Sequence, residues 1–85
     1  MRIDPKPTVP EVLPIALEYY EDHPMGGSLH VVLEDGNVAD KHVLMCAEWA
    51  AEKGDVPGLR LARILLRMSR PQRSRLGRLL HDNYA

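Results

Sequence analysis

The chain has 85 residues, of which 45% are hydrophobic and 27% charged, and its formal net charge is −1. A chain of this length folds as one domain and buries only about 60 to 65% of its unfolded surface, which excludes a deep internal active site. The single cysteine excludes an internal disulfide, and no apolar run approaches the ~20 residues that span a bilayer, so we expect a soluble, cytoplasmic protein without a membrane partner.

The N-terminal ten residues contain three prolines. Because prolines resist helix and remove backbone donors, we expect residues 1–10 to form an extended arm outside a single helical domain of residues 11–85. Glu11 to Asp22 is the first predicted helix, since its apolar residues recur at helical spacing. Pro14 lacks an amide hydrogen and is expected in the first turn, so regular helix is predicted from about Leu13.

The segment from Met25 to Gly36 is ambiguous. Its centre reads LHVVL, which has β propensity, and Asp35-Gly36 is a turn signal. A lone strand, however, has no neighbour for its backbone hydrogen bonds, and no second strand-like run exists in the chain. We therefore predict a two-turn helix from Leu29 to Asp35, with a strand pair swapped across a dimer as the alternative.

The most completely specified helix runs from Asn37 to Gly54. Asn37 can cap its start with Asp40 three residues on, and Gly54 provides a left-handed stop. Apolar side chains cover more than half of its circumference, so we expect the other helices to pack around it and a homo-oligomer to cover the surplus. These residues are Val38, Ala39, His42, Val43, Leu44, Cys46, Ala47, Trp49, Ala50 and Ala51.

Two further helices follow, and both begin with local signals. Asp55 can cap the first, with Pro57 in its first turn, and this helix is predicted to end at about Met68. Ser69 and Gln72 have the spacing of a capping box, which predicts the start of the second.

The last helix is predicted to end near His81. Gly77 within it lowers helix propensity, which indicates either close packing or fraying at that position. The succession of short helical segments, with no paired strands, predicts an all-α fold: a compact bundle of four to five short helices.

Charge is distributed unevenly along the chain. Residues 1–55 hold four Lys or Arg against eleven Asp or Glu, whereas residues 56–85 hold seven Arg against one Asp. Like charges at helical spacing disfavour a helix by a few tenths of a kcal/mol per pair, so a row of arginines needs something to offset it. Four arginines fall within an arc of about 80° on a helical wheel: Arg60, Arg63, Arg67 and Arg70.

A guanidinium group binds phosphate or carboxylate through two parallel hydrogen bonds. We therefore predict that the arginine row binds an anionic partner, either a small molecule such as a nucleotide or an acidic protein surface. A small DNA-binding regulator that contacts phosphates with the same row is the alternative. The competing interpretation is that the first half of the chain neutralises the row, through Glu18, Glu21, Asp22, Glu34 and Asp35.

A glycine pair offers a second candidate for anion binding. Gly26 and Gly27 are followed by Ser28 and then by the helix predicted from Leu29. The free amides of that helix and the Ser28 hydroxyl would form an anion site, which the glycines leave open to a ligand. The competing interpretation is a simple turn.

His42 and Cys46 stand at i and i+4, a spacing that lets two side chains of one helix bind one metal ion, with His30 as a third ligand. No CxxC or HExxH motif accompanies them, and a buried thiol beside a hydrogen-bonded histidine is the commoner arrangement. No serine lies in a nucleophile motif. We expect a non-enzymatic protein without metal or cofactor, and a metal-dependent enzyme using these three residues is the alternative.

The run HPMGGSLHVVLEDGNVADKHVLMC, with the later GDVPGLRLA and MSRPQRSRL, resembles short uncharacterised proteins encoded by tailed bacteriophages and prophages. The resemblance covers roughly residues 19–76 and transfers no catalytic residue. It implies the cytoplasm of an infected bacterium, where proteins of this size often act by binding. Inhibitors of host defence and sponges for nucleotide signals are examples of that role.

Overall fold

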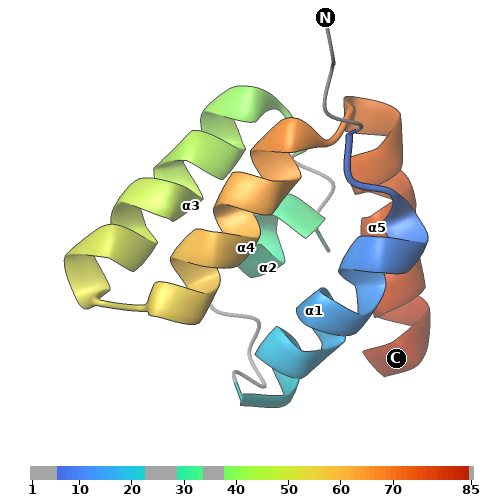
Figure 1. The fold of residues 1–85 in the computed structure, drawn as a ribbon, viewed down its shortest axis with the longest axis horizontal. Coiled ribbons are helices and arrows are strands. Elements are labelled where there is room, and N and C mark those ends of the chain that lie inside the picture. Colours follow the sequence, from blue (N-terminus) through green and yellow to red (C-terminus); the bar gives the residue numbers. More distant parts are fainter. Residues whose placement is uncertain (1–5, 23–28, 34–37, 85) are drawn as a thin grey trace, which may run out of the picture.

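Helices follow one another along the whole described part of the chain, which comprises residues 6–22, 29–33 and 38–84 of a computed structural model. Within these ranges there is no strand, and five helices are present (Figure 1). They are α1 Val9–Asp22, α2 Leu29–Leu33, α3 Asp40–Lys53, α4 Val56–Arg67 and α5 Arg70–Tyr84. The predicted all-α bundle is confirmed.

Segment 29–33 is helical, as predicted, and the strand alternative for it is wrong. Leu29 and Val32 are buried in the core. A short helix makes part of its backbone hydrogen bonds internally while burying these side chains, whereas a single strand without a neighbour makes none. The predicted end of this helix at Asp35 lies outside the described residues.

The helices pack in a closed circuit. In this circuit α4 lies between α3 and α1, α1 also packs on α5, α5 packs on α2, and α2 returns to α3 (Figure 1). All five helices therefore contribute to one core. Its largest fully buried side chains are Val12, Leu29, Val32, Val43, Leu61, Leu65, Leu76 and Leu80.

The expectation that the helix up to Gly54 forms the centre is wrong. In α3 only Val43, Cys46 and Ala50 are buried, whereas Trp49 is 42% exposed. The apolar residues of α3 extend around more of the helix than the one buried stripe, and Leu44 and Met45 are exposed on its other sides. The central position belongs to α4, which buries Leu61, Ala62 and Leu65 on one side and packs on both α3 and α1.

Helix α1 begins at Val9, four residues before the predicted start at Leu13. The carbonyl oxygen of Thr8 accepts the amides of Glu11 and Val12, both at 3.1 Å, so the first turn is closed earlier. Two residues of the predicted arm are therefore helical. Pro14 lies inside the helix rather than in its first turn; it is exposed, so its ring and the missing hydrogen bond face solvent.

The start of α3 is not formed by a side-chain cap. Ala39 occupies the N-cap position without a side-chain hydrogen bond, and Asp40 is the first helical residue. The predicted cap, Asn37, lies outside the described residues. The predicted stop is confirmed: Gly54 has φ 71°, and its amide donates to the carbonyl of Ala51 at 3.3 Å.

The predicted starts of the last two helices are confirmed. An Oδ1 atom of Asp55 accepts the amide of Gly58 at 3.1 Å at the start of α4. Ser69 and Gln72 form the reciprocal capping box, with distances of 3.1 and 3.3 Å. These caps need only neighbours in sequence, which is why the pattern predicts them.

Gly77 marks close packing rather than fraying. A side chain at this position of α5 would overlap the backbone carbonyl of Leu33 at the end of α2. The glycine therefore lets two helices approach closely enough for their backbones to touch. The last helix continues past His81, its predicted end, to Tyr84.

Candidate functional site

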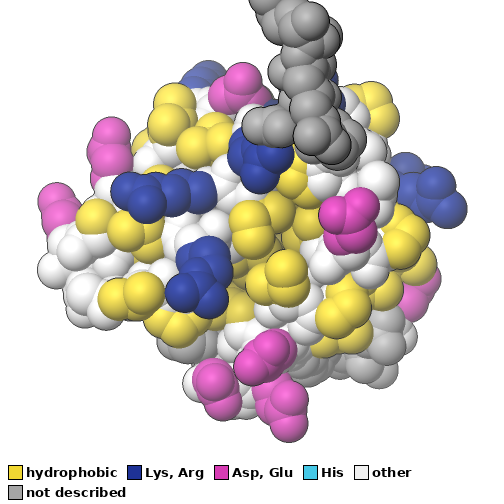
Figure 2. Space-filling view, in the orientation of Figure 1, with side chains coloured by type: hydrophobic (Ala, Val, Ile, Leu, Met, Phe, Trp, Pro, Cys, Tyr) yellow, Lys and Arg dark blue, Asp and Glu magenta, His cyan; other side chains and the backbone are white. Residues whose placement is uncertain are grey.

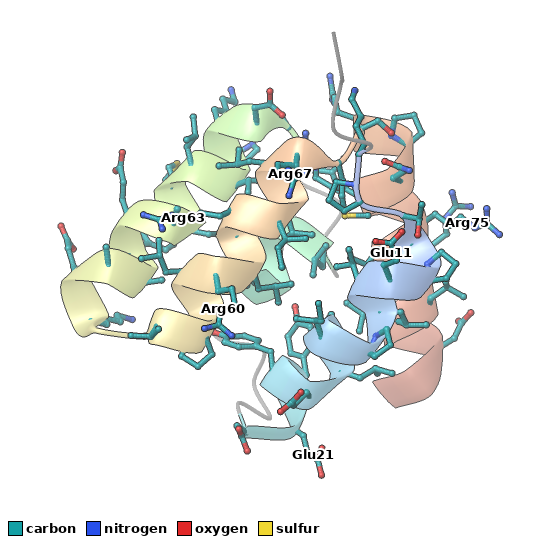
Figure 3. The ribbon with its side chains drawn as sticks, viewed as in Figure 1. Glu11, Glu21, Arg60, Arg63, Arg67 and Arg75 are labelled. Atoms are coloured by element: carbon teal, nitrogen blue, oxygen red, sulfur yellow. The ribbon has the colours of Figure 1, made fainter. Side chains whose placement is uncertain are left out.

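One outer face of α4 carries three of the four arginines of the predicted row. Arg60, Arg63 and Arg67 are all exposed. They lie one after another along the helix in Figure 3, on the side opposite the buried Leu61 and Leu65. The sharp division between buried leucines and exposed arginines fixes the rotation of α4. We call this surface the arginine face.

Arg70 does not belong to the arginine face. Helix α4 ends at Arg67, Met68 has extended backbone angles, and Arg70 is the first residue of α5. The prediction that four arginines share one helix is therefore wrong for Arg70. The helical wheel treated residues 59–70 as one continuous helix, whereas the helix is interrupted at Met68. Arg70 is exposed at the corner between the two helices.

The predicted arginines are not neutralised by the acidic half of the chain within the described ranges. None of the four makes a hydrogen bond or an ion pair there. The carboxylates of Glu18, Glu21 and Asp22 are exposed at the end of α1, and acidic side chains gather below α1 in Figure 2. Glu34 and Asp35 lie outside the described residues.

A shallow groove of about 350 Å³ runs along the arginine face. Its other lining side chains are apolar: Leu59 and Ile64 are partly buried, and Val56 is 62% exposed. Figure 2 shows the same mixture, with basic side chains over α4 standing among hydrophobic ones. The face therefore presents alternating charge and apolar surface rather than charge alone.

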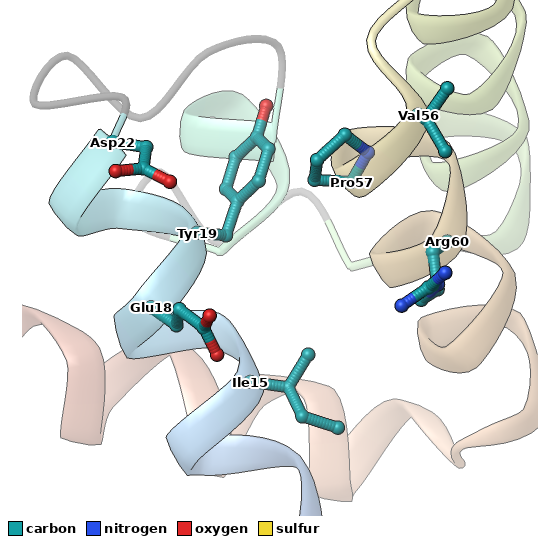
Figure 4. A pocket seen from close by; sticks show the side chains of 7 residues that line it. All are labelled: Ile15, Glu18, Tyr19, Asp22, Val56, Pro57 and Arg60. Carbon is teal, nitrogen blue, oxygen red and sulfur yellow. The ribbon is translucent and has the colours of Figure 1, made fainter.

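A second groove, of about 210 Å³, separates α4 from the end of α1 (Figure 4). Ile15, Tyr19 and Pro57 line it, and Arg60 on one helix stands across it from Glu18 on the other. No ion pair joins these two charged groups. Arg60 thus borders both grooves. The surface is basic on α4 and acidic on the neighbouring end of α1.

Tyr19 fixes the start of α4 against α1. Its hydroxyl donates to the Oδ2 atom of Asp55 at 2.8 Å, while the other carboxylate oxygen of Asp55 caps α4. Burial, followed by the hydrogen bond and the charge of Asp55, raises the pKa of the Tyr19 phenol well above its ordinary value. The arginine face is therefore held at a defined position relative to the acidic end of α1.

Arg73 is the charged residue that the sequence reasoning missed. Its side chain is buried, and it donates to the carbonyl of Val38 at 2.5 Å, to the carbonyl of Met68 at 3.2 Å and to the carboxylate of Asp40. One guanidinium therefore joins the start of α3, the end of α4 and the first turn of α5. The available signal was its position three residues before Leu76 on the buried face of α5.

A third opening lies at the corner between α4 and α5 and has a volume of about 680 Å³. We call it the corner cleft. Basic side chains dominate its lining, in contrast to the mixed groove on α4. The lining residues are Lys6, Asp40, Leu66, Arg67, Met68, Ser69, Arg70 and Arg73.

The described residues contain no group of three His, Cys, Asp or Glu side chains placed to hold a metal ion. Cys46 is buried in α3 and His42 is partly buried one turn earlier. The side chain of His30 and the whole of Gly26 to Ser28 lie outside the described residues, so neither the third metal ligand nor the glycine site is placed by the structure.

No protein family, curated protein or solved structure matches this chain. Within residues 6–22, 29–33 and 38–84, no helix has the length and apolar character needed to cross a membrane. The phage resemblance, the anionic partner and the homo-oligomer stay predictions. The predicted homo-oligomer depends on an exposed apolar surface of α3, which is formed by Leu44, Met45 and Trp49.

Proposed function

We propose that this protein is a non-enzymatic binding protein that docks an acidic protein surface on the arginine face. The observation that carries the proposal is the exposure of Arg60, Arg63 and Arg67 on one side of α4, without a carboxylate partner among the described residues. Their spacing of three and four residues makes them repel one another along the helix. Carboxylates on a partner would relieve this repulsion through charge-assisted hydrogen bonds.

The shape and composition of the groove favour a protein over a nucleotide as the partner of this face. The groove is shallow, and Val56, Leu59 and Ile64 alternate with the arginines along it. Arginine and apolar side chains together are typical of the buried centre of protein interfaces. A segment with carboxylates on successive helical turns and apolar residues between them would match both components.

Duplex DNA fits the same surface less well. Glu18 and Asp22 line the groove immediately beside Arg60, and Glu21 is exposed on the same end of α1. A duplex extends well beyond three arginines, so its phosphates would come close to these carboxylates and be repelled. A compact acidic protein segment can contact the arginines without reaching the end of α1.

The resemblance to tailed-phage proteins supports an infected bacterial cell as the setting. In that setting the acidic surface would belong to a host protein, and occupying it would inhibit that protein. This element of the proposal depends on the resemblance alone, whereas the chemistry of the partner depends on the arginine face.

Charge reversal on two helices tests the proposal. The probe is a fluorescent amphipathic helical peptide with glutamate and leucine at helical spacing, and its analogue with glutamine for glutamate is the neutral comparison. The test variant is Arg60→Glu with Arg63→Glu. The matched control is Arg75→Glu with Arg78→Glu, which makes the same charge change at exposed positions of α5. Arg75 projects at the right-hand edge of the molecule in Figure 3, away from α4.

We expect the unaltered protein to bind the acidic peptide, measured by fluorescence anisotropy, and the α4 variant to bind it about tenfold or more weakly. The α5 variant should stay within about twofold, because only screened, long-range charge changes there. Equal losses in both variants would show that net charge alone attracts the peptide. Tight binding of a 20-base-pair duplex, with a log-log salt slope near −0.9 per neutralised phosphate, would favour the DNA-binding alternative.

A further inference from the structure

The corner cleft has a charge balance unlike that of the arginine face. Four of its lining residues are cationic, and only Asp40 carries a carboxylate. That carboxylate already accepts from the buried guanidinium of Arg73. Asp40 and Arg73 therefore form one wall of the cleft, and their opposite charges cancel. The remaining three cations, Lys6, Arg67 and Arg70, are exposed.

These three cations come from different segments that the fold brings together. Lys6 precedes α1, Arg67 ends α4 and Arg70 begins α5. Within the described ranges none of them makes an ion pair or a hydrogen bond. Positive charges that converge on one concave opening repel one another, and a multiply charged anion placed between them would remove that repulsion.

We propose that the corner cleft binds a phosphorylated small molecule, with its phosphoryl oxygens held by Lys6, Arg67 and Arg70. A terminal phosphate carries up to two negative charges and three acceptor oxygens, so it can bridge three cationic side chains, whereas a carboxylate has only two oxygens. The volume of about 680 Å³ lies within the range of small-molecule sites. Leu66 and Met68 add apolar wall for the rest of the ligand.

Recognition in the cleft depends on side chains rather than on the amides at the start of α5. Pro71 has no amide hydrogen, and the amide of Gln72 already donates to the Ser69 hydroxyl at 3.3 Å. The capping box and Pro71 therefore remove most of the amide donors that a helix N-terminus would otherwise offer to an anion. Substitution of the basic side chains should consequently remove binding without any change to the helix start.

This inference goes beyond the docking of an acidic protein surface, since the two sites share only Arg67. The two can fail independently. Arg60 and Arg63 do not line the cleft, and Arg70 and Lys6 do not line the groove of the arginine face. The variants that test one site are therefore controls for the other.

The test is an NMR titration of the full chain at constant ionic strength with EDTA present. Pyrophosphate, ATP and adenosine are the three probes. We expect pyrophosphate and ATP to shift the signals of Arg67 and Arg70 and adenosine to shift none. Similar affinities for the two phosphorylated probes would show that the phosphoryl group is sufficient, and a much higher affinity for ATP would identify a nucleotide as the source.

The decisive comparison is between Arg70→Gln and Arg75→Gln, two exposed arginines near the start of α5. Arg70→Gln should weaken ATP binding about tenfold or more, Lys6→Gln should weaken it by several-fold, and Arg75→Gln should change it by less than twofold. Circular dichroism of each variant verifies the fold. Equal effects of Arg70→Gln and Arg75→Gln, binding of adenosine as tight as that of ATP, or no saturable binding of either phosphorylated probe would overturn the proposal.

Discussion

At the scale of single residues, Tyr19 shows how one polar contact positions the candidate site. Its hydroxyl donates to one oxygen of the Asp55 carboxylate, and the other oxygen of that carboxylate caps α4. Asp55 therefore connects the start of α4 to α1. A hydrogen bond to a charged acceptor contributes about 1.5 to 3 kcal/mol to stability. The position of the arginine face therefore depends on the phenol of Tyr19, whose partner Asp55 is 36 residues away in sequence.

Replacement of Tyr19 by phenylalanine should lower the free energy of unfolding by about 1.5 kcal/mol at neutral pH, because Asp55 loses a donor. The loss should shrink in alkaline solution. The folded protein keeps the phenol pKa above the ordinary value of 10.0, so the unaltered protein loses stability as the pH rises through that value, while the phenylalanine variant lacks this contribution.

Urea unfolding of both proteins at pH 7 and at about pH 11 measures the change. The difference between the two proteins matters rather than either value alone, since all other titrating groups are shared. If the difference in the free energy of unfolding between the two proteins is as large at the alkaline pH as at neutral pH, the assignment of the raised pKa to Tyr19 is contradicted.

At the scale of helices, signals that involve neighbours in sequence predict structure well. Asp55, the Ser69 and Gln72 pair, and Gly54 mark helix ends through contacts within three or four residues, and all are found as predicted. The early start of α1 at Val9 is marked by the same kind of signal, although three nearby prolines favour extended chain. Thr8 and Glu11 have the spacing of a capping box, and the Thr8 hydroxyl donates to the Glu11 carboxylate at 2.9 Å. Burial of Val9 against the rest of the bundle adds to this local signal.

The close packing of α2 on α5 can be tested by substitution of Gly77. Gly77→Ala should raise helix propensity by about 1 kcal/mol, but the added methyl group overlaps the carbonyl of Leu33, which is backbone and cannot rotate away. A clash with backbone lies in the upper part of the overpacking cost, about 2 to 3 kcal/mol, so the net effect should be destabilising by about 1 to 2 kcal/mol.

The matched control is Arg78→Ala, the next residue of the same helix, which is exposed and should change stability by less than about 0.5 kcal/mol. Thermal unfolding of the two variants gives the comparison. A Gly77→Ala protein that is more stable than the unaltered one would mean that α2 does not lie against α5 as closely as the structure shows.

At the scale of the whole molecule, the corner of three helices is what the sequence did not reveal. The wheel predicts that Arg60, Arg63 and Arg67 share one side of α4, and Leu61 and Leu65 are buried on the other side. It cannot predict that Arg73 is buried, since that side chain's partners Val38 and Asp40 are 35 and 33 residues away in sequence. For the same reason the convergence of Lys6, Arg67 and Arg70 appears only once the chain is folded.

Arg73 also links the stability of the bundle to the geometry of the corner cleft. Arg73→Lys keeps the charge but replaces a planar fork that contacts two carbonyls and a carboxylate with a single ammonium group that cannot reach all three. We expect a loss of about 2 to 3 kcal/mol in the free energy of unfolding, because backbone carbonyls at the start of α3 and the end of α4 lose buried donors.

Urea unfolding measures the loss, with Arg75→Lys as the control at an exposed position of the same helix. Amide hydrogen exchange should show the largest drop in protection in the first turn of α3, since Arg73 holds that end through Val38 and Asp40. If both lysine variants unfold at the same urea concentration, the three helices are held together by their apolar core alone. In that case the corner cleft has no rigid wall against which a ligand could be positioned.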